Sequence, residues 1–350
     1  MSKHLKKTLI FAAKILLAGI LLGYVISKVH WSDYYIVSNG QQILVHGFAS
    51  TITRANPYLM IGAFICSLFP IIILTIRWRY LLKVQSIDVS FWEVLKDTFL
   101  GAFFNYVIPG NVSGDLVKAY YMAQTTRKPV AVAVSVFVDR AIGLFEFALL
   151  PAGMIIAIYL SGAYQPSKIA LPAIITIAAL IIVSLGLATV ISSRFRSLLG
   201  LRRVLSWLPL KRHLIMAAKA GNMYGRKPAA LFIAIIISLI GQLLFISTIM
   251  LVGFSMGLEI RWYQFFLYIP LIYIVAAIPV SPGGLGLTEA LYMTFFTSKS
   301  VSASEVLAMA LAARIIPMVC SLPGVIVALK GPKIPSAEQI EAELAEQQIS

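Results

Sequence analysis

The stretches NYVIPGNVSGDLVKAYYM (105–122) and AIPVSPGGLGLTEALYM (277–293) decide the fold of this chain. Each stretch interrupts apolar sequence with proline and glycine and then adds a carboxylate, and an arginine follows within later apolar sequence. The distance from carboxylate to arginine is 25 residues in both copies: Asp115 to Arg140 (140 − 115) and Glu289 to Arg314 (314 − 289). Helix breaks and charges are both costly in lipid, so their joint duplication predicts a two-fold repeated membrane protein whose site lies where the copies meet.

The composition places the chain in a membrane. Of its 350 residues, 59% are hydrophobic and 12% are charged, and the mean hydropathy is +0.89; soluble domains average roughly 25% charged residues. The net charge of +15 comes from basic residues that cluster at the ends of apolar segments, a pattern that the positive-inside bias explains without a nucleic-acid partner. We therefore predict one integral membrane domain over 1–335, followed by an acidic cytoplasmic tail at 336–350.

Six apolar stretches are long enough to cross a membrane, which takes about 20 helical residues. They are 9–26, 57–76, 129–160, 168–192, 229–255 and 305–329. Two further segments, 91–125 and 262–298, run from short apolar stretches into the breaks and are expected to form re-entrant or broken-helix hairpins. The sequence thus predicts an all-α polytopic membrane protein with about six full spans. The first stretch lacks a clear cleavage site, so we read it as an uncleaved helix rather than a signal peptide.

The distribution of lysine and arginine predicts the orientation. Nine basic residues lie in the segment 194–227, whereas 27–56 carries two. Three more, Arg77, Arg79 and Lys83, follow the second span. Both termini and the 194–227 linker are therefore expected in the cytoplasm of a multi-pass protein of the cell (inner or plasma) membrane. The linker is either a set of interfacial helices on anionic lipid or a solvated connector.

The orientation has a consequence for the two hairpins. The first is bracketed by cytoplasmic basic residues, and the second follows a span that runs outward. They enter from opposite faces, so the halves, at about 57–193 and 228–330, are expected to form an inverted repeat, as in many alternating-access carriers.

The chain resembles the lysylphosphatidylglycerol synthase transmembrane-region family in four strings of sequence. They are the first stretch quoted above, SVFVDRAIG (135–143), IPVSPGGLGLTEALY (278–292) and the later ALAAR. This family is the flippase-like half of the multiple peptide resistance factor. The resemblance covers roughly 10–330 and implies a lipid translocase fold with paired re-entrant elements. In that factor a soluble aminoacyl-transfer domain follows the membrane region; here we expect a stand-alone member without it, which leaves the lipid open. The Asn-Val-Ser-Gly-Asp turn also departs from the more glycine-rich turn expected at that point.

The charged residues within the spans are the candidate headgroup site. Arg140 and Arg314 are expected to bind a lipid phosphate, because guanidinium suits bidentate binding of phosphate and a charge at a helix centre costs about 2.5–3.5 kcal/mol on insertion scales. The alternative is that they form buried ion pairs with Asp115 and Glu289. Asp139 is either a cation or proton site or the partner of a lysine or arginine on the cytoplasmic side.

The breaks are the other part of the candidate site, because broken helices expose backbone N–H groups at a positive dipole end, which suits an anion. Their glycines can instead serve close helix packing. The candidate residues of the breaks are Asn105, Pro109, Gly110, Gly114, Pro282, Gly283 and Gly284. No catalytic residue, metal site or cofactor is expected, since neither metal-ligand spacing nor a Walker lysine is present.

These observations favour a non-enzymatic lipid translocase that moves a phosphate-bearing lipid between leaflets. The expected partners are anionic or zwitterionic phospholipids, with a homodimer or a separate lipid-modifying enzyme left open. Three alternatives remain: an ion- or proton-coupled carrier of a soluble anion, an accessory scaffold for a membrane glycosyltransferase or lipid synthase, and an intramembrane lipid-modifying enzyme. A nucleophile–base pair, which the last would need, is not evident.

Overall fold

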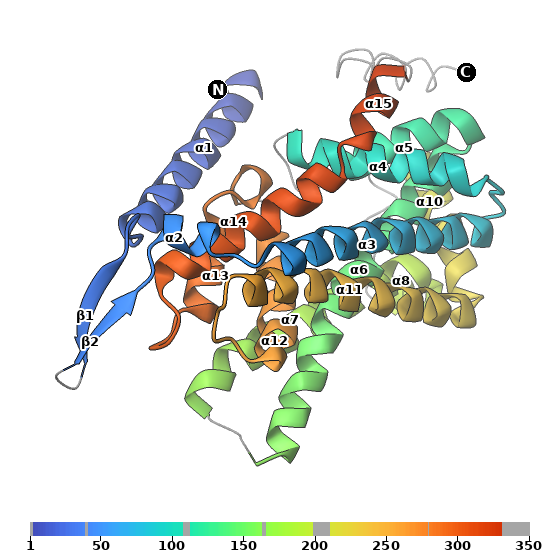
Figure 1. Ribbon diagram of the computed structural model, residues 1–350. Coiled ribbons are helices and arrows are strands. Elements are labelled where there is room, and N and C mark those ends of the chain that lie inside the picture. The colour runs from blue at the N-terminus through green and yellow to red at the C-terminus, as the bar shows by residue number, and fades with distance from the viewer. Residues whose placement is uncertain are drawn as a thin grey trace.

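The computed structural model describes residues 3–38, 41–107, 113–162, 166–198, 211–278 and 280–330, and most of them are helical (Figure 1). The chain begins with α1 (Lys3–Ser27), the strands β1 (Tyr34–Ser38) and β2 (Gln41–Val45), and α2 (Phe48–Thr53). It continues with α3 (Pro57–Val84), α4 (Phe91–Val107), α5 (Ser113–Thr126), α6 (Pro129–Leu160), α7 (Pro166–Ile191) and α8 (Ser193–Leu198). The remaining elements are α10 (Lys211–Gly225), α11 (Pro228–Ser255), α12 (Trp262–Ala276), η1 (Pro282–Gly284), α13 (Leu287–Phe296), α14 (Ala303–Cys320) and α15 (Pro323–Lys330).

The predicted class, an all-α polytopic membrane protein, is confirmed. Within the described residues, α3, α6, α7, α11 and α14 are long and apolar enough to cross a membrane. Their outward faces remain apolar, as on α7, where Ile174, Ile177 and Ile181 are more than half exposed. Such a surface is unfavourable in water and suits contact with lipid chains. The inverted relation of the two halves stays a prediction.

The sequence sets the ends of these helices through local capping. Asn56 precedes α3, and its Oδ1 accepts hydrogen bonds from the backbone N–H groups of Tyr58 and Leu59 at 2.9 and 3.3 Å. Ser302 and Glu305 form a reciprocal capping box before α14, at 3.2 and 2.7 Å. These side chains satisfy N–H groups that the first helical turn leaves without partners.

Each predicted hairpin consists of two helices separated at the proline-glycine break. α4 and α5 flank the first break, and α12 and α13 flank the second, where η1 forms a single turn. Pro109 and Gly110 lie outside the described residues, as does the tail at 336–350. In the second break, Gly283, Gly284 and Gly286 have φ values of 59°, 68° and 77°, a region that glycine enters without strain.

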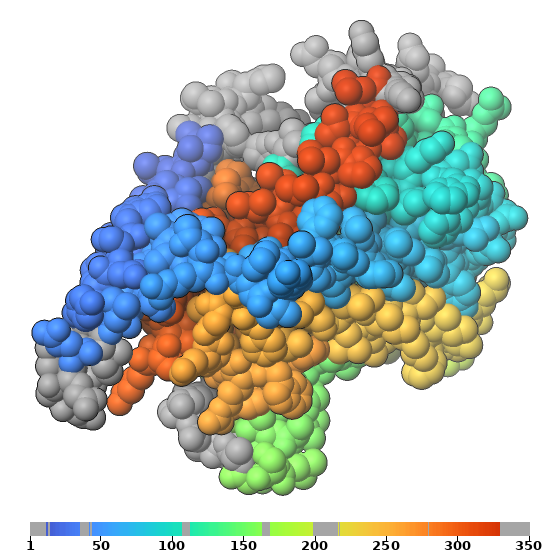
Figure 2. All heavy atoms as spheres, viewed as in Figure 1, coloured from blue at the N-terminus to red at the C-terminus, as the bar shows by residue number. Residues whose placement is uncertain are grey.

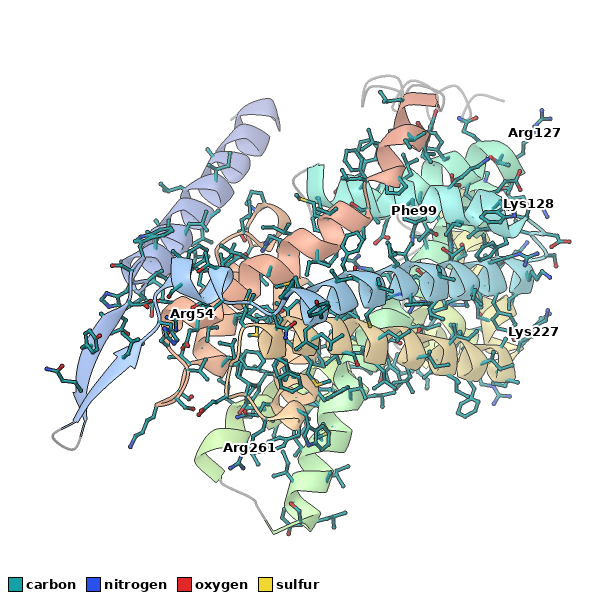
Figure 3. All side chains as sticks on the ribbon, viewed as in Figure 1. Arg54, Phe99, Arg127, Lys128, Lys227 and Arg261 are labelled. Atoms are coloured by element: carbon teal, nitrogen blue, oxygen red, sulfur yellow. The ribbon has the colours of Figure 1, made fainter. Side chains whose placement is uncertain are left out.

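The prediction of one continuous span at 305–329 is wrong, because this segment forms two helices. α14 ends at Cys320, and α15 starts at Pro323 and packs against α4 (Figure 1). Proline lacks a backbone N–H and restricts the residue before it, so the helix ends there and restarts with Pro323 in its first turn. Gly324 then lies so close to the Phe99 carbonyl that a Cβ would overlap it (Figure 3 labels Phe99).

α3 and α11 form the centre of the molecule and lie side by side along most of their length. Figure 2 shows their atoms in contact across the front face. Gly241 of α11 permits this approach, because a Cβ there would lie 3.0 Å from the Ile73 side chain of α3. The largest apolar core joins α3 and α11 to α12, α13 and α14. It therefore holds the second hairpin and α14 against the central pair.

Candidate functional site

A cavity of about 410 Å³ lies between the two broken hairpins. Its walls come from α3, α4, α5 and α6 on one side and from α12, η1, α13 and α14 on the other. The charged residues that line it are Arg77, Asp115, Lys118, Asp139, Arg140, Glu146 and Arg314. Asn105, Gly283 and Gly284 also line the cavity, so most of the predicted site residues lie around one space.

The first copy of the repeated pattern forms an ion pair. Arg140 Nη1 lies 2.7 Å from Asp115 Oδ2, so the shared 25-residue spacing brings the charges of α5 and α6 into contact. Lys118, one turn after Asp115, lies 3.2 Å from Asp115 Oδ1 and 3.2 Å from Asp139 Oδ2. The carboxylate of Asp115 is therefore shared between Lys118 and Arg140. The Arg140 side chain keeps 35% of its surface exposed, which leaves it accessible from the cavity.

The second copy forms the matching pair. Arg314 Nη2 and Nε lie 2.7 and 2.8 Å from Glu289 Oε1. Arg314 also donates to the carbonyl oxygens of Gly283, at 3.0 Å, and Gly284, at 3.4 Å. The break thus presents carbonyl groups to the arginine. The N–H of Gly286, at the start of α13, donates to Glu289 Oε2 at 2.8 Å, so this N–H group is already occupied.

Asp139 is a partner of buried cations. Its Oδ1 accepts from Arg77 Nε at 2.7 Å and its Oδ2 from Lys118 Nζ at 3.2 Å. Asp139 therefore pairs with an arginine and a lysine, as one interpretation of the sequence expected, but both of these partners are buried and line the cavity. Because Arg77, Lys118 and Asp139 are all less than 9% exposed, the three charges form a buried cluster that ties α3 and α5 to α6.

Arg77 is buried, whereas the sequence places it in an exposed basic flank after the second span. It is 3% exposed and lines the cavity. α3 continues to Val84, eight residues beyond the expected end of the span at 76, so Arg77 lies inside the helix rather than in the flank. Its Nη1 donates to Ser238 of α11 and lies 3.7 Å from Glu146 Oε1.

In the first break, Asn105 and Gly114 have structural roles. Asn105 Oδ1 accepts from the Gly114 N–H at 3.0 Å and caps the start of α5. A Cβ on Gly114 would overlap the Gly101 carbonyl oxygen of α4, so Gly114 serves close helix packing. Pro282 sits in the first turn of η1 and is not among the residues that line the cavity.

The candidates predicted from the sequence do not include three charged residues of the lining: Arg77, Lys118 and Glu146. Lys118 follows Asp115 by three residues, a spacing that brings side chains together on a helix and was a usable signal. Glu146 shares a helix face with Asp139, seven residues away. Arg77 gave no signal of its own, because a cation just beyond an apolar stretch is typical of a membrane flank. In the part of the chain that the structure describes, no group of three or more His, Cys, Asp or Glu is arranged to hold a metal ion.

The lysylphosphatidylglycerol synthase transmembrane-region model matches residues 11–324. The chain belongs to this family. Because the family is the membrane region of a lipid synthase, the chain is a multi-pass membrane protein with a lipid-related role.

Its relatives include archaeal proteins named UPF0104 membrane proteins. One from Methanothermobacter thermautotrophicus is 24% identical over 303 residues, 80% of this chain and 88% of the relative. One from Pyrococcus horikoshii is 25% identical over 304 residues, 80% of this chain and 89% of the relative. A third, from Methanocaldococcus jannaschii, is 30% identical over 98 residues, 26% of this chain and 29% of the relative.

Proposed function

We propose that this chain is a lipid translocase that moves a phosphate-bearing lipid between leaflets by exposing a headgroup site to each side in turn. The observation that carries the proposal is that Arg140 and Arg314, from different halves of the chain, line one cavity. Guanidinium groups bind phosphate oxygens through paired hydrogen bonds. The family is described as the membrane region of a lipid synthase, and this supports a lipid rather than a nucleotide or a sugar as the source of that phosphate.

The size of the cavity limits what it holds. Its volume of about 410 Å³ lies at the low end of the roughly 300–1,000 Å³ of small-molecule sites. It suits a headgroup, so the acyl chains would stay in the bilayer while the polar group crosses. A charged groove lowers the barrier that hydrocarbon presents to a bare headgroup.

The ion pairs favour an exchange mechanism. When Arg140 turns from Asp115 to a phosphate, Asp115 keeps its contact with Lys118 at 3.2 Å. When Arg314 does so, Glu289 keeps the hydrogen bond from the Gly286 N–H at 2.8 Å. Neither carboxylate is left without a partner, which would be costly in a buried site. The arginines can therefore release and recover the headgroup at a moderate cost.

The charges at the surface support a cytoplasmic placement of one end. Arg127, Lys128 and Lys227 lie together at one end of the molecule, and Arg54 and Arg261 lie toward the other (Figure 3). Such a one-sided concentration of basic residues is typical of the cytoplasmic face. We propose this orientation in the cell membrane, and we propose transport rather than catalysis for the cavity.

Reconstitution tests the proposal. The purified full chain is placed in vesicles with a fluorescent phospholipid, and loss of fluorescence to an external quencher reports exchange between leaflets. Uptake of labelled phosphate into the same vesicles is measured in parallel. We expect lipid exchange well above that of protein-free vesicles and no phosphate uptake. Phosphate uptake without lipid exchange would instead establish the soluble-anion carrier.

A further inference from the structure

The charges around the cavity balance. Four cations and four carboxylates of the described residues surround it, counting Glu289, which pairs with Arg314 from behind the lining. The cations are Arg77, Lys118, Arg140 and Arg314, and the carboxylates are Asp115, Asp139, Glu146 and Glu289. If all eight side chains are ionised, their net charge is zero. A phosphodiester headgroup would add one negative charge to this buried site, and an uncompensated buried charge is strongly unfavourable.

With both arginines paired as in this structure, three of the four carboxyl groups have no room for a compensating proton. Asp115 and Asp139 each have both oxygens in contact with cationic nitrogens, at 2.7 and 3.2 Å in each case. Glu289 accepts from Arg314 on one oxygen and from a backbone N–H on the other. A proton on any of these oxygens would displace a donor that already points at it.

Glu146 differs from the other three. It is 5% exposed and lines the cavity, its Oε1 lies 3.7 Å from Arg77 Nη1, and its Oε2 has no hydrogen-bond partner. The Ser238 hydroxyl accepts from Arg77 and can still donate its own proton to the Glu146 carboxyl, so Oε2 is the oxygen that is left without a donor. A buried carboxylate oxygen without a donor is costly, and a proton on that oxygen removes the cost.

The charged and titratable groups around the cavity that Glu146 lines come from several elements. α3 provides Arg77, α5 provides Asp115 and Lys118, and α6 itself provides Asp139 and Arg140. Across the cavity, α12 provides Tyr273 and α14 provides Arg314. α11 contributes Ser238, and the described parts of α7 and α10 place no charged residue in the lining. Arg77 is the nearest cation, and it is already neutralised by Asp139 at 2.7 Å.

A continuous line of alternating charges joins Glu146 to the arginine proposed to bind phosphate. The line runs through Arg140, Asp115, Lys118, Asp139, Arg77 and Glu146, with each neighbouring pair 2.7 to 3.7 Å apart. When Arg140 leaves Asp115, Lys118 is drawn toward Asp115 and away from Asp139, and Arg77 is then drawn more fully to Asp139. The attraction between Arg77 and Glu146 then weakens, and Glu146 becomes easier to protonate.

We propose that binding of a phosphate-bearing headgroup in this cavity is coupled to the uptake of one proton by Glu146. This inference rests on the proposed function and names its energy source. The carboxylate takes a proton from the side on which the headgroup enters and returns it on the side on which the headgroup leaves. One proton then moves with each monoanionic headgroup, and a proton gradient drives the lipid across.

Calorimetry on the detergent-solubilised full chain tests this coupling. Short-chain dihexanoyl phosphatidylglycerol is titrated in buffers of different ionisation enthalpy, which gives the number of protons taken up per bound ligand. Dimethyl phosphate, a soluble diester of the same charge, is the parallel ligand and distinguishes a lipid site from a general phosphate site. Glu146→Gln removes the proton acceptor, and Glu259→Gln is the matched control, because Glu259 is exposed and lies outside the cavity.

For the wild type and Glu259→Gln we expect uptake of about one proton per bound diester. Over the pH range in which Glu146 is ionised in the ligand-free protein, their dissociation constants should rise about tenfold per pH unit. Glu146→Gln should bind without proton uptake and without this pH dependence. Binding by the wild type without proton uptake overturns the coupling and leaves the translocase standing, whether or not the variant folds. Proton uptake retained by Glu146→Gln also overturns it. Failure of both ligands to bind overturns the translocase and the coupling together.

Discussion

At the scale of single residues, the Glu289–Arg314 pair combines a buried carboxylate with a cation that reaches into the cavity. The Glu289 side chain is 2% exposed and the Arg314 side chain is 21% exposed. The carboxylate has little access to water, so it depends on the arginine and on the Gly286 N–H for its partners. The pair is therefore part of the structure as well as a candidate headgroup site.

Breaking this pair from one side should destabilise the protein. Arg314→Gln leaves a buried carboxylate without its cation, and we expect a loss of roughly 3 kcal/mol, the low end for buried pairs because the arginine is partly exposed. The double variant Glu289→Gln/Arg314→Gln should recover part of that loss, since neither charge remains. Thermal unfolding of the purified proteins measures both effects. Additive losses in the double variant would show that the two side chains are not coupled.

The sequence predicts the ion pairs of the two copies but not the whole charge cluster. Equal spacing in two similar stretches brings Asp115 to Arg140 and Glu289 to Arg314, and both contacts are present. The sequence did not predict the burial of Arg77, because that burial depends on where α3 ends and apolar composition does not define that end. Tertiary contacts alone make it a cavity residue.

At the scale of elements, the first hairpin depends on close contact between α4 and α5. A Cβ on Gly114 would overlap the Gly101 carbonyl oxygen and lie 2.7 Å from the Asn105 side chain. Both neighbours are held, one as backbone and the other by its hydrogen bond to Gly114. The two helices can therefore accept a side chain at this position only by moving apart.

Gly114→Ala should for this reason lower the melting temperature markedly and reduce the yield of folded protein. Gly186→Ala is the control, because a Cβ there meets nothing within 4 Å and alanine is a better helix former than glycine by about 1 kcal/mol. The melting temperature of Gly186→Ala should be unchanged or slightly raised. Equal melting temperatures for both variants and the wild type would contradict the packing described for the hairpin.

The loop between α1 and α3 depends on Asp33. Its Oδ1 accepts from the Gly47 N–H at 2.8 Å and from the Ser50 hydroxyl. These hydrogen bonds, that from Ser50 first, lower the pKa of Asp33 to about 2. Because the folded pKa lies below the unfolded value of about 4, the carboxylate stabilises the loop above pH 4, and this contribution is lost as the pH falls from about 4 to 2.

Hydrogen exchange around Gly47 should therefore be slow at pH 5 and above, and faster in Asp33→Asn at the same pH. Asp88→Asn serves as the control, since the Asp88 side chain is 87% exposed and its contact with Lys83 is 4.0 Å long. Unchanged protection in Asp33→Asn would mean that the β1–β2 hairpin and α2 are held by other contacts.

Element boundaries were the part of the fold that the sequence defined least well. The spans and both broken hairpins follow from apolar stretches and proline-glycine pairs. The β1–β2 hairpin was not predicted, because its two five-residue strands lie in a segment interpreted only by its low charge. The end of α14 was also missed, although Pro323 carried the signal; its apolar surroundings concealed the break.

At the scale of the whole molecule, the two halves meet at a single cavity. Its walls come from the first hairpin, α3 and α6 on one side and from the second hairpin and α14 on the other. The central α3–α11 pair connects the halves. Motion of one half against the other would change which side of the membrane reaches the arginines, without loss of either ion pair, since each pair lies within one half.

In the proposed mechanism, arginines from both halves hold one headgroup. The most direct measurement is the rate of leaflet exchange of a labelled phospholipid in vesicles containing wild type, Arg140→Gln, Arg314→Gln or Arg261→Gln, at equal amounts of folded protein. Arg261, labelled in Figure 3, is exposed and is not among the residues that line the cavity, so its variant controls for loss of a positive charge. We expect each cavity variant to lose at least about tenfold in rate, equivalent to about 1.4 kcal/mol, and Arg261→Gln to match the wild type. Exchange that persists at the wild-type rate in either cavity variant would contradict a shared headgroup site.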